Sequence, residues 1–172
     1  GGTDGDLLRG LDGDDRLEGN YGADILKGNE GRDTLIGGSG ADILNGGKSA
    51  DVIYGGGRGD TIIGGNGKDK LFGDGGNDVI EGNRNRDVMT GGTGADTFVF
   101  RGDHGHDRIK DFDPAEDKLL MIGEVGDMAA FTGALTTQNG QAVFDFGVDN
   151  LNTIFFEGLE IADLMNANVE FS

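Results

Sequence analysis

Aspartate recurs at every ninth position through the first part of the chain. The eleven members of this series are Asp6, Asp15, Asp24, Asp33, Asp42, Asp51, Asp60, Asp69, Asp78, Asp87 and Asp96. Carboxylates are hard oxygen ligands, and a set of them suits calcium better than zinc or copper. Magnesium fits less well because it demands a tight octahedron and retains water. The alternative is an ordinary turn-forming role for each aspartate, which does not explain why the series keeps one register throughout.

Two further columns share this period, so that residues 1–99 fit the frame Gly-x-x-x-x-Asp-x-aliphatic-x eleven times. Glycine opens the units at Gly1, Gly10, Gly19, Gly28, Gly37, Gly46, Gly55, Gly64, Gly73, Gly82 and Gly91. The eighth place is filled by Leu8, Leu17, Leu26, Leu35, Leu44, Ile53, Ile62, Leu71, Ile80, Met89 and Phe98. Glycine adopts backbone conformations that a Cβ disfavours, so we predict a turn in the first half of each unit. The last three residues then alternate as a short strand, with only the eighth facing a core.

This frame resembles the nonapeptide repeat of RTX calcium-binding proteins. The resemblance implies an all-β fold, a right-handed parallel β-roll solenoid in which two units form one coil and each unit stacks on the next but one. Asp24 then lies beside Asp42, and eleven units give up to nine calcium sites. The resemblance also implies main-chain carbonyl ligands from the first four turn positions, for which we expect Gly38, Gly40, Gly47, Gly65, Gly67, Gly76, Gly92 and Gly94.

Four units depart from the glycine expected at the fourth position, where they carry Asp4, Ser49, Arg58 and Asn85. Asparagine tolerates the left-handed region of backbone space, whereas arginine is strained there. We therefore expect the weakest cation sites at the turn that contains Arg58.

The composition limits the partners of the chain. Its formal net charge of -18 excludes nucleic acid and anionic membranes, which both need a basic surface. No apolar run approaches the length of a transmembrane span. The absence of cysteine rules out disulfides and is compatible with export. Because the repeats begin in register at Gly1, we expect the chain to be the C-terminal part of a longer exported protein with an upstream domain.

The repeats supply only one large apolar side chain per nine residues. Ordering a glycine-rich chain costs roughly 1 to 2 kcal/mol of backbone entropy per residue, and stacked aspartates repel one another. We therefore predict that residues 1–99 are disordered without calcium and fold when it binds.

The period ends after Val99. The segments 96–100, 107–112 and 116–119 resemble the closing block that follows RTX repeats in serralysin-type proteases and other type I secreted proteins. This resemblance implies a small, irregular, β-rich cap over residues 100–172 that includes a signal for a type I secretion apparatus. We expect Asp107 and Asp111 to complete a last calcium site, with solvated turn carboxylates as the alternative.

Within the cap, residues 142–157 alternate as a hairpin around Asp149 and Asn150, and 159–165 indicate a short helix before a terminal strand. His104 and His106 form a His-x-His pair, which we interpret as solvated loop histidines and not as a metal site. The sequence contains no Gly-x-Ser-x-Gly, His-Glu-x-x-His or Walker motif. We therefore predict no catalytic activity in this chain.

An apolar column runs along the outward ninth position of the even repeats, at Ile36, Tyr54 and Phe72. Such a stripe often marks a contact surface, and here it would receive the cap, a companion domain or the faces of sugar rings. Simple β propensity is the alternative.

These features predict a non-catalytic, calcium-binding module that supports the folding and secretion of a larger extracellular bacterial protein. The main alternative is a polysaccharide-binding module, because the layout also resembles the R-modules of mannuronan C-5 epimerases, whose chains end in a run comparable to residues 168–171. Ten basic residues against eighteen acidic ones in the repeats weaken that alternative. A segment of an adhesin is a third alternative.

Overall fold

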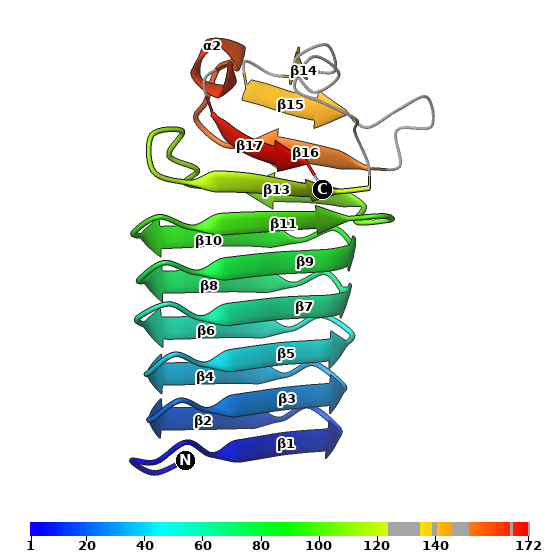
Figure 1. Ribbon diagram of the computed structural model, residues 1–172. Coiled ribbons are helices and arrows are strands. Elements are labelled where there is room, and N and C mark those ends of the chain that lie inside the picture. The colour runs from blue at the N-terminus through cyan, green and yellow to red at the C-terminus, as the bar shows by residue number, and fades with distance from the viewer. Residues whose placement is uncertain (124–134, 139–140, 146–151, 166, 172) are drawn as a thin grey trace.

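The computed structural model describes residues 1–123, 135–138, 141–145, 152–165 and 167–171. It is a parallel β-solenoid with a small cap stacked on one end (Figure 1). The strands of the repeats are β1 (Leu7–Asp12), β2 (Arg16–Tyr21), β3 (Ile25–Glu30), β4 (Thr34–Ser39), β5 (Ile43–Lys48), β6 (Val52–Gly57), β7 (Thr61–Gly67), β8 (Lys70–Gly75), β9 (Val79–Asn85), β10 (Val88–Thr93) and β11 (Thr97–Arg101). Odd and even strands form opposite sheets, so two nonapeptides make one coil as the RTX resemblance implies.

The two sheets stack each repeat on the next but one. Leu8 pairs with Leu26 in the first sheet, and Leu17 pairs with Leu35 in the second. This register continues up both sheets and places the eighth residues on one another across a single apolar layer. Every eighth residue from Leu26 to Phe98 is fully buried, whereas Leu8 and Leu17 at the open end are partly buried. The core is therefore continuous but only one side chain wide.

The strands are longer than the three residues expected from the sequence. Most run over the opening glycine to the third position of the next unit, as in β3, and β7 and β9 run to the fourth. The pairing omits the opening glycine itself: Lys27 pairs with Asn45 and Asn29 with Gly47, while Gly28 between them is buried. The turn proper is thereby reduced to two or three residues that end at the aspartate.

The cap continues both sheets beyond the last nonapeptide. Its elements are β12 (His106–Ile109), β13 (Lys118–Ile122), β14 (Leu135–Gln138), β15 (Gln141–Asp145), β16 (Thr153–Phe156), α2 (Ile161–Leu164) and β17 (Asn168–Phe171). β13 and β17 extend the odd sheet, whereas β12, β16, β15 and β14 extend the even one. The change at residue 99 is thus a change of sequence period and not a break in the sheets.

Aromatic rings close the core at this end. Phe112 lies 5.9 Å from Phe98 and 5.6 Å from Phe156, measured between ring centroids. The hairpin predicted over 142–157 is confirmed by the antiparallel pairing of β15 with β16, although its tip at Asp149 and Asn150 lies outside the described residues. The short helix is confirmed as α2. The antiparallel partner β14 was not predicted.

Candidate metal centre

The aspartates of the repeats form two continuous ladders, one along each edge of the solenoid. In each step the backbone N–H of one aspartate donates to Oδ1 of the aspartate one coil above. Asp24 donates to Asp42 at 2.7 Å and Asp51 donates to Asp69 at 2.8 Å. Because the carboxylate and the amide come from stacked turns, each coil is tied to the next by its aspartate.

The second oxygen of these carboxylates is buried without a hydrogen bond from any described residue. This holds for Oδ2 of nine aspartates: Asp15, Asp24, Asp33, Asp42, Asp51, Asp60, Asp69, Asp78 and Asp87. A buried, unpaired, charged oxygen is costly, and buried charges in proteins are normally paired or bound to a metal. A column of such atoms therefore fits the binding of a cation at each step.

The opening glycine of each unit provides the space beside this oxygen. A Cβ added at Gly55 would lie 2.5 Å from Oδ2 of Asp60 and 2.8 Å from the carbonyl oxygen of Gly73. The backbone at Gly55 does not have a positive φ. Glycine is therefore required here for room next to two oxygens, and not for an unusual backbone conformation.

Carbonyl oxygens line the gap between stacked turns. The carbonyls of Gly38, Gly47 and Gly76 each point at the turn one coil above, against Gly56, Gly65 and Gly94. Of the other glycines expected as ligands, Gly40, Gly65, Gly67, Gly92 and Gly94 face a carbonyl from the coil below. The carbonyls of Ser49, Arg58 and Asp74 occupy equivalent places. Sequence reasoning missed them because it looked for glycine, whereas every residue type has a main-chain carbonyl.

Comparison with protein families matches the model of the RTX calcium-binding nonapeptide repeat to residues 1–35, 27–62, 54–89, 63–98 and 81–109. Together these matches run through the whole solenoid and over well over half of the chain. The chain belongs to the RTX calcium-binding repeat family.

Comparison with curated proteins gave no match. Among solved structures, the chain resembles the AlgE6R3 subunit of the mannuronan C5-epimerase of Azotobacter vinelandii, with 26% identity, a TM-score of 0.48, and coverage of 81% of this chain and 79% of that one. It also resembles the extracellular lipase LipA of Serratia marcescens, with 21% identity and a TM-score of 0.46. The second match covers 100% of this chain but 39% of the lipase.

The oxygens of the RTX turns fit calcium. The described residues include no cluster of three or more His, Asp or Glu side chains around one point. A cation between two turns would therefore take carboxylate oxygens from two stacked aspartates, such as Asp42 and Asp60, and main-chain carbonyls for the rest. Calcium accepts six to eight such oxygens in flexible geometry. The RTX repeats are thus a calcium-binding β-roll.

Burial raises the pKa of the ladder carboxyls from Asp33 to Asp96. Desolvation is the main cause, and the neighbouring aspartates raise the pKa further, whereas the backbone N–H bond to each carboxylate lowers it. The pKa reaches about 7 at Asp51 and Asp60, about 6 at Asp69 and Asp96, and about 8 at Asp87. Near neutral pH these carboxyls are therefore partly protonated unless a cation balances their negative charge.

The ladders extend two steps into the cap. Asp87 donates its N–H to Oδ1 of Asp107, and Asp96 donates to Oδ1 of Asp117, both at 2.9 Å. Asp107 and Asp117 are buried. Asp117 was missed in the sequence because it lies 21 residues after Asp96 and not 18.

The second oxygens in these last two steps contact the protein. Oδ2 of Asp117 accepts the N–H of Asp113 at 2.8 Å, and Oδ2 of Asp107 lies 3.2 Å from Nδ1 of His104. The two oxygens of Asp111 accept the N–H groups of Gly91 and Gly92, at 2.8 and 2.9 Å. The cap therefore ends the ladders with its own donors. A last calcium site at Asp107 and Asp111 stays a prediction.

The interpretation of His104 as a solvated loop residue is wrong. Its side chain is 1% exposed and lies edge-on to the ring of Phe100, with centroids 5.1 Å apart. The loop before β12 folds inward, which places the imidazole of His104 beside the carboxylate of Asp107, the last aspartate of its ladder. His106, in contrast, lies at the surface beside a pocket.

The outward column of the even sheet has the expected register, with Ile36 beside Tyr54 and Tyr54 beside Phe72. The rings of Tyr54 and Phe72 stack with centroids 4.9 Å apart and an interplanar angle of 9°. Tyr54 is 36% exposed.

Of the helices that the structure describes, none is long and apolar enough to cross a membrane.

Proposed function

We propose that this RTX β-roll is a calcium-dependent folding module in the C-terminal part of a larger exported protein. Calcium fills the gaps between stacked turns, and the roll forms outside the cell, where calcium is abundant. The proposal is supported mainly by the nine buried Oδ2 atoms that no described residue pairs. Its roles are to support an upstream domain and to delay folding until after passage through a type I secretion apparatus.

The magnitude of the metal contribution matches the need. Extracellular calcium modules bind with dissociation constants of about 0.1 to 1 mM. At a free concentration of ten times that constant, each site adds about 1.4 kcal/mol, so nine sites add roughly 12 kcal/mol. This is comparable to the whole stability of a typical domain, about 5 to 15 kcal/mol. A one-residue-wide core therefore becomes stable only with its ions.

A calcium titration followed by circular dichroism tests the proposal, with magnesium as the control ion. A cooperative rise in strand signal near millimolar calcium, absent with magnesium, is expected. A spectrum already rich in strand in excess chelator would contradict the switch. The proposal assigns no catalytic role to the module, and an activity assay on the calcium-loaded chain checks that point.

A second candidate function is polysaccharide binding, which the stacked rings of Tyr54 and Phe72 favour. The two rings stack face to face, so together they form an apolar ridge of ring edges on the open sheet, against which the apolar face of a sugar can lie. Binding to an immobilised uronate polymer that is lost in Tyr54→Ala would support it, whereas equal retention of the variant would not.

A further inference from the structure

Six of the fourteen basic residues gather on one part of this acidic chain, around the even sheet where it meets the cap. They are Lys68, Lys70, Arg84, Arg86, Arg108 and Lys110. All six are exposed. Lys70 lies in β8, Arg108 in β12 and Arg84 near the end of β9, whereas Lys68, Arg86 and Lys110 directly follow β7, β9 and β12. The cluster is therefore a product of stacking and not of local sequence. We call this cluster the basic patch.

The basic patch shares a face with the stacked rings. Two outward columns cross the even sheet. In the column before the inward residue, Lys70 pairs with Val88 and Val88 with Arg108. In the column after it, Tyr54 pairs with Phe72 and Phe72 with Thr90. The aromatic pair and the basic side chains therefore form one strip that runs along the axis of the solenoid.

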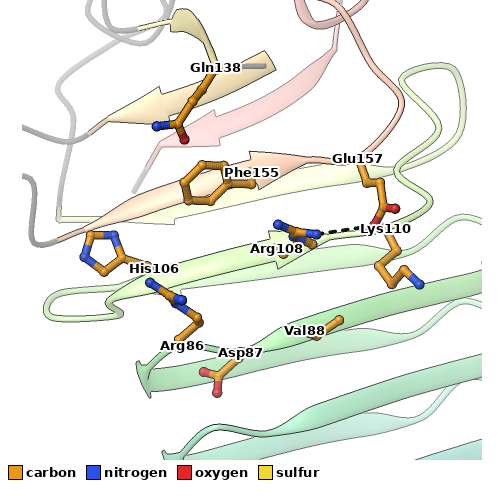
Figure 2. Close-up of a pocket in the computed structure, with 9 residues that line it drawn as sticks. All are labelled: Arg86, Asp87, Val88, His106, Arg108, Lys110, Gln138, Phe155 and Glu157. Carbon is orange, nitrogen blue, oxygen red and sulfur yellow. Dashed lines mark ion pairs between the residues drawn. The ribbon is translucent and has the colours of Figure 1, made fainter. Parts of the chain in front are cut away.

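The far end of this strip is a pocket of about 460 Å³. Figure 2 shows Phe155 between Gln138 and Arg108, with His106, Arg86 and Lys110 around it. Phe155 pairs directly with Arg108 on the neighbouring strand. Two acidic residues also line the pocket: Asp87, which is buried in its ladder, and Glu157, whose carboxylate lies 4.0 Å from Arg108. The pocket thus combines an aromatic side chain with three cationic ones.

The net charge of -18 for the whole chain does not reflect the local charge of this face. Half of the eighteen acidic residues in the repeats are buried in the ladders, namely Asp24, Asp33, Asp42, Asp51, Asp60, Asp69, Asp78, Asp87 and Asp96. Between Thr34 and Lys110 the two outward columns of the even sheet carry no carboxylate in the described residues. The excess of acid in the sequence therefore does not weigh against an anionic ligand here.

We propose that the strip from Tyr54 to the pocket at Phe155 binds a linear acidic polysaccharide, with sugar rings on the aromatic side chains and carboxylates on Arg86, Arg108 and Lys110. The inference rests on the second candidate function and assigns its ligand class and binding residues. Arginine pairs with carboxylates through two parallel hydrogen bonds. The strip is long and open, which suits a chain more than a small molecule.

A calorimetric titration of the calcium-saturated full chain tests this assignment. The probes are a hexamer of (1→4)-linked uronic acid, a neutral hexamer of (1→4)-linked glucose, and an oligothymidylate of the same charge as the uronate. The test variant is Arg108→Gln with Lys110→Gln. The matched control is Arg9→Gln with Lys27→Gln, which makes the same change of net charge at exposed positions on the opposite sheet.

The expected result is binding of the uronate hexamer alone, weakened roughly tenfold in the test variant and less than about twofold in the control. Circular dichroism in calcium verifies that both variants are folded. Equal binding of the neutral hexamer, or equal losses in the two variants, would overturn the charge assignment but leave polysaccharide binding standing. If neither sugar binds, both the charge assignment and polysaccharide binding are overturned. Tighter binding of the oligothymidylate would overturn the assignment to a polysaccharide.

Discussion

The backbone N–H of Asp96 donates to Oδ1 of Asp117 across 21 residues, at the same 2.9 Å that joins Asp78 to Asp96 across 18. The repeat period has ended between them, yet the ladder has not. Asp117 then accepts the N–H of Asp113 with its other oxygen. The cap is thus fitted to the last coil by the same contact that holds the repeats together.

Replacing Asp117 by alanine should destabilise the junction of cap and roll. The buried N–H of Asp96 loses its acceptor, at a cost of about 1 to 3 kcal/mol. The N–H of Asp113, an exposed residue, also loses its acceptor, at a smaller cost because water can replace it. Calcium-loaded thermal unfolding measures the loss. Asp103→Ala, at an exposed position in the same part of the chain, is the control. A variant as stable as that control would show that the cap does not depend on this bond.

The opening glycines should tolerate no side chain. In Gly55→Ala the new Cβ meets Oδ2 of Asp60 and the carbonyl of Gly73, so we expect a loss of roughly 2 kcal/mol or more and a higher calcium requirement. Gly57→Ala is the matched control, because its nearest non-neighbouring atom lies 3.9 Å away. Calcium titrations of the two variants decide the matter, and similar midpoints would refute the role given to Gly55.

Removing one ladder charge should have opposite effects on the stability of the roll with and without calcium. Asp60→Asn keeps an oxygen that accepts the N–H of Asp42 but removes a charged ligand from two adjacent sites. We expect weaker calcium binding, and a more stable roll in excess chelator because a buried carboxylate is gone. Asp12→Asn, at an exposed position, is the control. The same direction of change in both conditions would contradict the metal role of Asp60.

Arg58 occupies a left-handed conformation with φ of 80°, as the sequence led us to expect for a strained turn. Arg58→Gly should relieve about 1 kcal/mol of strain and lower the calcium midpoint. Asn85→Gly, where φ is 90°, should gain less because asparagine tolerates this region. Equal gains at both positions would mean that the arginine side chain is not the source of the strain.

Acidification should favour the roll when calcium is absent. The carboxyls of Asp51, Asp60 and Asp87 have their pKa raised from 3.8 to about 7, 7 and 8 by burial and by neighbouring carboxylates. The folded state therefore binds protons that the unfolded chain has released, so stability is present below the unfolded pKa and is lost as pH rises through the folded pKa. In excess chelator, the strand signal should increase as pH falls from above 8 toward 5.

The same protons compete with calcium for the carboxylates. The calcium concentration at the folding midpoint should therefore rise as pH falls over this range. Circular dichroism across pH, with and without calcium, measures both effects. A calcium-free chain whose signal does not change with pH would mean that the aspartates are not buried in that state.

The nonapeptide frame determined that residues 1–99 form a repeat structure with Asp6 to Asp96 at equivalent positions, because like units stack in like ways. The pairing of every second repeat was implied by the RTX resemblance, and the pairing of Leu8 with Leu26 confirms it. The frame also placed Ile36, Tyr54 and Phe72 in one column. Two roles of glycine were not separable from the sequence: the opening residue such as Gly55 makes room for oxygens, while second-position residues such as Gly56 adopt a positive φ.

Only the tertiary structure decided the features that depend on which segments become neighbours. Asp117 and His104 join the ladders, and Asp111 binds the amides of Gly91 and Gly92. The sequence separations of these contacts do not follow the nine-residue period, so the repeat does not predict them. The basic patch arises in the same way, since Lys70, Arg86 and Arg108 meet through the stacking of separate coils. A repeat fixes the contacts between identical units, but contacts between unlike segments depend on the path of the folded chain.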